Sequence, residues 1–111
     1  MPFDPGLAER VRTLLEDVPD VRELKMFGGV GWTIGGNMAT GAHSDGRLVV
    51  RCSRDDFEAY LAEHGADGMK RNGRNLAGWL LIDSDVLEDD ATLTRWVGRG
   101  RAYAESLPKK T

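Results

Sequence analysis

Apolar residues recur at helical spacing in three segments of the chain, residues 5–18, 53–64 and 89–107. In each segment they fall on one helical face, with polar residues on the other. Asp4 is suited to cap the first segment, and Pro5 suits its first helical position, where no backbone N–H is needed. The spacing therefore predicts three amphipathic helices that cover a common core.

Other segments alternate between apolar and polar residues, which is typical of strands with one buried face. Four of them precede the second helix, at residues 21–27, 30–34, 38–43 and 47–52. Turn signals separate these strands at Gly35-Gly36-Asn37 and at Asp45-Gly46.

A fifth strand is predicted at residues 76–83, which are almost continuously apolar, and the polar residues 66–75 before it are predicted to form a loop. The order is therefore α-β-β-β-β-α-β-α. Short connections between the strands favour antiparallel pairing. The pattern predicts one α+β domain over residues 1–111, a two-layer sandwich with three helices on one face of an antiparallel sheet of four or five strands.

Such a sheet leaves its second face uncovered, and the alternation indicates which residues that face carries. The residues that point away from the predicted helices are Gly31, Thr33, Arg47, Val49, Arg51 and Trp79. Small residues beside a few large ones make a surface on which another protein could pack, so we take this set as the candidate interaction surface. The alternative is an ordinary solvated sheet face.

The glycines of residues 28–36 do not form a phosphate-binding loop. They interleave with a strand pattern, another strand follows, and the Gly-Lys-Ser/Thr signature is absent. Glycine inside a strand marks a bend, a bulge or a close backbone approach. We expect a sharp hairpin at Gly28-Gly29 and a strand whose outer face lacks side chains at Gly31.

Composition narrows the possible functions further. The net charge of −3 does not favour nucleic-acid binding by the protein as a whole, and the single cysteine excludes an internal disulfide. The N-terminal residues do not resemble a signal peptide, and no segment approaches the roughly 20 apolar residues that span a bilayer. We expect a cytoplasmic protein that has no membrane partner.

No group of residues has the pattern of a catalytic, cofactor or metal site. His43 and His64 lie in different elements, with no ligand at zinc spacing. Cys52 falls on the inward face of its strand and has no visible base. The acidic residues 83–90 precede a helix and are explained by capping. We therefore predict no enzymatic activity, no cofactor and no metal.

Two other functions remain open from the residues alone. Nucleic acid could bind through a basic loop and the last helix, which carry Lys70, Arg71, Arg74, Arg95 and Arg99. A small molecule could bind, or react, in a pocket between sheet and helices near Trp32, Trp79 and Trp96.

The order of several short motifs resembles the TfoX N-terminal domain family, named for the TfoX/Sxy regulators of bacterial natural competence. The family's Met-Phe-Gly-Gly start corresponds to Met26, Phe27, Gly28 and Gly29. An Asp-Gly turn at Asp45-Gly46, a strand ending in Arg51, an aromatic strand with Gly78-Trp79 and a final helix with Trp96 follow in the family's order. The resemblance covers about residues 5–107.

This resemblance implies a fold similar to that of the type III secretion chaperones, and no catalytic residues are established in the family. It also implies a role in transcription regulation, because TfoX proteins act as coactivators alongside the cyclic-AMP receptor protein. We therefore expect a non-enzymatic regulatory adaptor with a protein partner, such as a transcription factor of that type. The open sheet face or a sheet edge would also allow a two-fold homodimer.

Overall fold

The computed structural model describes residues 4–26 and 28–110, so Phe27 of the family motif lies outside the described residues. The chain forms four helices and six strands within these residues. The helices are α1 (Pro5–Leu15), α2 (Arg54–Leu61), α3 (Ser84–Leu87) and α4 (Asp90–Ser106). The strands are β1 (Val21–Met26), β2 (Gly29–Ile34), β3 (Asn37–Ala42), β4 (Leu48–Arg51), β5 (Ala66–Arg71) and β6 (Arg74–Ile82).

The three predicted helices are present, and each begins where a side chain caps its first turn. Asp4 accepts hydrogen bonds from the backbone N–H groups of the first turn of α1, and Ser53 accepts one from Asp56 N. Asp89 accepts one from Thr92 N and thereby begins α4. These caps satisfy backbone donors that have no partner within the helix.

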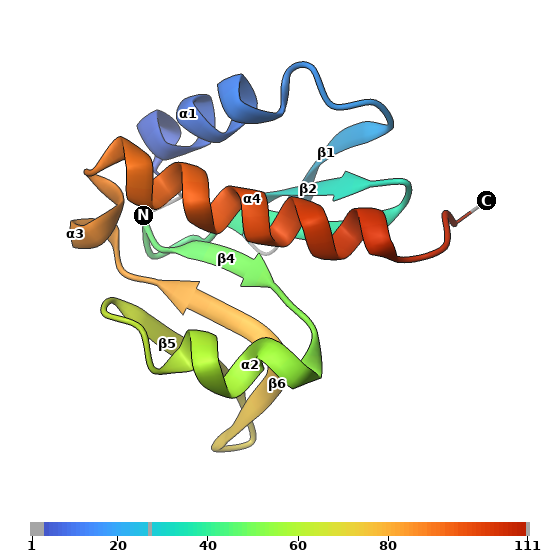
Figure 1. Ribbon diagram of the computed structural model, residues 1–111. Coiled ribbons are helices and arrows are strands. Elements are labelled where there is room, and N and C mark those ends of the chain that lie inside the picture. Colours follow the sequence, from blue (N-terminus) through green and yellow to red (C-terminus); the bar gives the residue numbers. More distant parts are fainter. Residues whose placement is uncertain (1–3, 27, 111) are drawn as a thin grey trace.

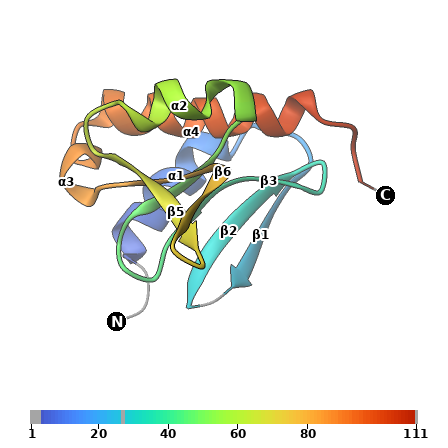
Figure 2. The same ribbon diagram turned by 90° about the horizontal axis from the view of Figure 1, so that it is seen from below.

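All strand pairs are antiparallel, as expected, and the sheet order is β1-β2-β3-β4-β6-β5. β6 pairs with β4, so the chain passes from β4 through α2 to β5 at the far edge of the sheet and returns along β6. The three longer helices cover one face of the sheet, and α4 runs across it (Figures 1 and 2). The prediction of a two-layer α+β sandwich is confirmed.

The sheet has six strands because residues 66–75, predicted to be a loop, contain β5 and the start of β6. Asn72 and Gly73 both have positive φ angles, of 54° and 78°, and connect Arg71 to its partner Arg74. An Asn-Gly pair suits the two-residue turns that join antiparallel strands. The segment is polar because the hairpin lies at the edge of the sheet, largely exposed. The fourth helix, α3, is a single turn between β6 and α4.

The core lies between the helices and the sheet. The inward residues of β2 and β4, which include Trp32 and Val50, are buried, and they pack with Trp96 of α4. Near the middle of α4, Gly100 lies so close to β3 that a Cβ atom placed on it would be 2.3 Å from the Ala39 carbonyl oxygen. The absent side chain lets the helix backbone rest on the sheet. Across the described residues no helix has the length and apolar character needed to cross a membrane.

Two glycines of α4 should therefore respond in opposite ways to alanine. We expect Gly100→Ala to lower the free energy of unfolding by about 2–3 kcal/mol, because the backbone of β3 cannot move away cheaply. Gly98 is exposed and has no neighbour near its missing Cβ. Gly98→Ala should raise stability by about 0.5–1 kcal/mol through helix propensity. Urea unfolding measures both, and equal stabilities for the two variants would contradict this packing.

Candidate functional site

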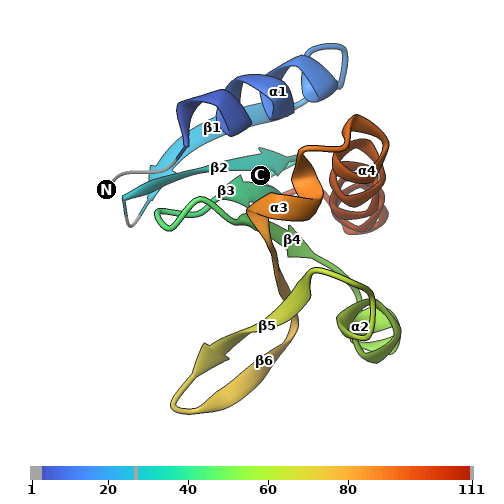
Figure 3. The ribbon, with the colours of Figure 1, turned by 90° about the vertical axis from the view of Figure 1, so that its left-hand side faces the viewer.

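A groove lies on the sheet face that the helices leave uncovered. Its volume is about 400 Å³, and its lining is almost entirely apolar. We call it the methionine groove. It is lined by Met26, Gly29, Val30, Met38, Gly41, Ala42, His43, Ser44, Val49, Met69, Leu76 and Trp79. Figure 3 shows the β1–β2 and β5–β6 hairpins extending toward the same side of the molecule, away from α4 and α2. The groove lies between them.

Two paired glycines keep the floor of the groove low. Gly31 of β2 is the cross-strand partner of Gly41 of β3. A Cβ atom on Gly31 would lie 2.7 Å from Met26 Sδ and 2.8 Å from Met38 Cε, so these side chains occupy the space that a larger residue would fill. The expectation of a strand whose outer face lacks a side chain at Gly31 is confirmed. It creates room for methionine, not for phosphate.

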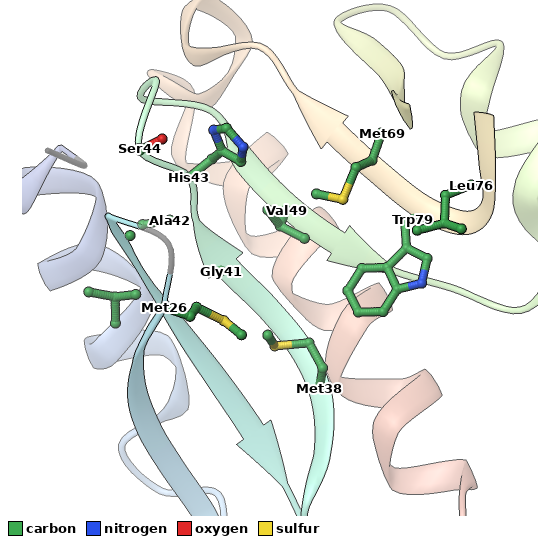
Figure 4. A pocket seen from close by; sticks show the side chains of 12 residues that line it. Met26, Met38, Gly41, Ala42, His43, Ser44, Val49, Met69, Leu76 and Trp79 are labelled. Carbon is green, nitrogen blue, oxygen red and sulfur yellow. The ribbon is translucent and has the colours of Figure 1, made fainter. Parts of the chain in front are cut away.

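Three of the chain's four methionines line the groove, and they come from three different strands. Figure 4 shows Met26 of β1 and Met38 of β3 pointing toward one another, with Met69 of β5 and Trp79 of β6 on the far side of Val49. Methionine side chains are flexible and polarizable, which suits surfaces that adapt to an apolar partner. The groove therefore combines a rigid backbone floor with walls that can rearrange.

An irregularity in the β5–β6 hairpin brings its apolar residues into the groove. The pairing register shifts between Gly68 and Lys70, and Gly78 has a φ of 91° and accepts a hydrogen bond from Cys52 N at 2.8 Å. In a regular strand Leu76 and Trp79 would point to opposite faces. Here both line the groove.

The residues of the predicted interaction surface lie in or beside the groove. Val49 and Trp79 line it, and Gly31 lies under the methionines. Thr33 is the cross-strand partner of Met38. The Arg51 guanidinium lies 5.2 Å from the ring centre of Trp79 and also 5.2 Å from that of Tyr103. Arg47 lies at the other end of β4, where it forms an ion pair with Asp45 at 2.7 Å.

Sequence reasoning missed the methionines themselves. The predictions placed Met26 in the first strand and in the family motif, Met38 in a weak strand and Met69 in a loop, and none of them was taken as a site residue for binding. The Asn72-Gly73 turn was the signal that could have placed Met69 on a strand. The other signal was that three of the four methionines fall in three different strands, but only the sheet order shows that these strands line one groove.

The five basic residues proposed for nucleic acid do not converge. Arg95 and Arg99 belong to α4, in the helical layer, where they lie 3.6 Å and 2.9 Å from the Glu63 carboxylate. Arg99 also lies over the rings of Tyr60 and Trp96. Lys70, Arg71 and Arg74 lie on the β5–β6 hairpin at the edge of the sheet. The two groups are therefore held on different layers of the molecule.

The three tryptophans near which a small-molecule pocket was predicted do not line a common pocket. Trp32 and Trp96 are buried in the core, and Trp32 Nε1 donates to Glu23 at 3.0 Å. Trp79 lies on the opposite face of the sheet, in the groove. A fluorescence change on ligand binding in the groove would come from Trp79.

The groups capable of chemistry are held in unreactive settings. Burial raises the pKa of the Cys52 thiol, and the nearby Asp56 charge acts in the same direction. His43 Nδ1 lies 3.0 Å from the Asp45 carboxylate at the rim of the groove, whereas His64 is exposed just beyond α2. Among residues 4–26 and 28–110, no three His, Cys, Asp or Glu side chains are grouped so that they could hold a metal ion.

Comparison with known proteins agrees with the motif order. The model of the TfoX N-terminal domain matches residues 13–104, most of the chain. The resemblance drawn from the sequence is confirmed. No curated protein and no solved structure matches the chain.

The Asp45 turn at the rim of the groove should make stability depend on pH. Burial opposes ionisation of the Asp45 carboxyl, but hydrogen bonds from Arg47 and the charges of His43 and Arg47 outweigh it and lower the pKa to about 2. A carboxyl whose pKa is lower in the folded state stabilises the fold above its unfolded pKa of about 3.9. This stabilisation is lost as the pH falls from about 4 to 2.

We expect Asp45→Asn to destabilise the protein by about 1 kcal/mol at pH 7, since the side chain is 40% exposed and solvent screens its interactions. The difference between variant and wild type should shrink toward zero near pH 2. Urea unfolding at pH 7, 4 and 2.5 measures it, and 1 M NaCl should reduce it at pH 7. A difference that stays constant down to pH 2.5 would contradict the role of this carboxylate.

Proposed function

Because the chain belongs to the TfoX N-terminal domain family, we propose that it is a non-enzymatic protein-interaction domain whose partner docks in the methionine groove. The observation that carries the proposal is the groove itself. Three methionines, Val49, Leu76 and Trp79 form an apolar surface on the sheet face opposite the helices. Contiguous apolar surface on a small protein marks a site of association.

The physical reason is the cost of leaving this surface in water. Residues of β2 and β3 that point to either face of the sheet are buried along almost the whole length of both strands. The helices, however, cover only one face of the sheet. The second face owes its burial to the side chains that lie over it, among them Met26 and Met38. A partner that packed on them would remove further apolar area, at about 25 cal/mol per Å².

The absence of a reactive constellation among the described residues favours an adaptor over an enzyme. The buried thiol of Cys52 has a raised pKa, and His43 is engaged by Asp45. We extend the proposal to a role in transcription regulation, in which the partner is a regulatory protein. The support for this extension is family membership and the resemblance on which it rests.

A glutamate placed on the wall of the groove should abolish partner binding. Met38 is half-buried on β3, so Met38→Glu puts a charge into the apolar surface, where desolvation disfavours docking. Tagged wild-type protein should retain a host protein from lysate that Met38→Glu loses by at least tenfold. The same loss is expected for Arg51→Glu, next to Trp79.

The matched control is Ala59→Glu, which introduces the same charge at an exposed position of α2. It should retain the partner. The capture is repeated after nuclease treatment, and retention that disappears with nuclease would assign the surface to nucleic acid. Equal retention by Met38→Glu and Ala59→Glu would contradict docking in the groove.

A further inference from the structure

The groove offers no backbone partners to a docked chain. It lies on the face of the sheet, where the strands already pair with one another from β1 through β5. An extended peptide lying on this floor would leave its own N–H and C=O groups without partners, which is costly in apolar surroundings. A helix satisfies these groups internally and presents a stripe of side chains. The sheet face therefore favours binding of a helix over binding of an extended peptide.

The span from Met26 to Trp79 gives a length for that helix. Met26 on β1 and Trp79 on β6 are separated by four strand spacings, because β2, β3 and β4 lie between them. At ~4.8 Å per spacing this is about 19 Å. A helix rises 1.5 Å per residue, so about 13 residues would cover this span.

One end of the groove carries positive charge that no carboxylate of the described residues neutralises. Arg71 and Arg74 are direct cross-strand partners. By alternation they lie on the same face of the hairpin as Met69 and Leu76, which line the groove. Neither arginine takes part in the ion pairs found among the described residues.

Like charges directly opposite one another destabilise a strand pair, and an approaching anion relieves this repulsion. Arg51 adds a third cation over Trp79 and is likewise outside those ion pairs. Two acids that lie close in sequence to residues lining the groove already have partners: Asp45 pairs with Arg47, and Asp67 lies 3.8 Å from Lys70.

From this arrangement we propose that the groove binds an acidic amphipathic helix of about 13 residues from a partner protein. Its apolar stripe lies on Met26, Met38 and Val49, and its carboxylates face Arg71, Arg74 and Arg51. The inference rests on the proposed function and names the chemistry of the partner. A second copy of this chain, docked face to face about a two-fold axis that runs along the groove, would instead bring the two cationic ends together.

The test uses three capped 14-residue peptides. The first has leucine at i, i+3, i+4 and i+7 spacing with glutamate elsewhere. The second replaces glutamate by lysine. The third has the composition of the first, with its leucines in strict alternation. Binding is followed through the ¹³C-labelled methyl groups of methionine, since three of the four methionines line the groove.

The glutamate helix should shift the signals of Met26, Met38 and Met69 saturably, and the other two peptides should bind at least tenfold more weakly. Arg71→Glu/Arg74→Glu should weaken binding of the glutamate helix at least tenfold and improve binding of the lysine helix. The control Arg54→Glu/Arg101→Glu has the same net charge, with both changes in the helical layer. It should leave both affinities unchanged.

Equal binding of the three peptides, or equal effects of the two double variants, would overturn the acidic-helix assignment. Unmoved methyl signals with all three peptides, while Met38→Glu still loses a captured protein, would also overturn it and leave the docking function intact. If a single-stranded DNA oligonucleotide shifts these methyl signals and the glutamate helix does not, both proposals fail.

Discussion

The architecture depends on the close approach of α4 to β3 at Gly100. Without a Cβ atom there, the helix backbone rests against the Ala39 carbonyl. The α4 residues Trp96, Val97 and Ala104 are buried on the side of the helix that faces the sheet. One long helix thus covers the middle of the sheet, with α1 and α2 beside it (Figure 2). All three longer helices pack on the same face of the sheet. The opposite face of the sheet must be covered by its own side chains or by something else.

The chain covers that face with side chains that can move. At Gly31 and Gly41 the sheet presents bare backbone, and the thioethers of Met26 and Met38 lie over it. Leu24, on the same face of β1, is 45% exposed and is the one exposed large apolar side chain of the described residues. Rigid β-branched residues would hold a fixed shape here. Methionine shields the floor while the groove is empty and can repack around a docked surface.

Much of this fold could be predicted from local pattern, because helix caps and strand alternation act within a few residues. The caps of α1, α2 and α4 and the outward position of Val49 are of this kind. β5 was missed because an exposed edge hairpin needs no apolar alternation, and its Asn72-Gly73 turn is only two residues. The groove was not predictable, since only the order β1-β2-β3-β4-β6-β5 makes Met26 and Met69 line the same groove. The placement of Arg74 on the β5–β6 hairpin and of Arg99 in the helical layer likewise depends on the topology and could not be predicted from local pattern.

The distribution of charge on the open face bears on what it can bind. A nucleic-acid strand carries a charge at every nucleotide and needs cations along its whole path. Here Arg71 and Arg74 lie at one end, and the floor from Met26 to Val49 is apolar. A uniformly charged ligand would therefore be desolvated over most of its length without compensation. A ligand whose apolar and anionic parts are separated loses no such solvation. The separation of the groove's floor from its cations thus favours an amphipathic protein segment over a polyanion.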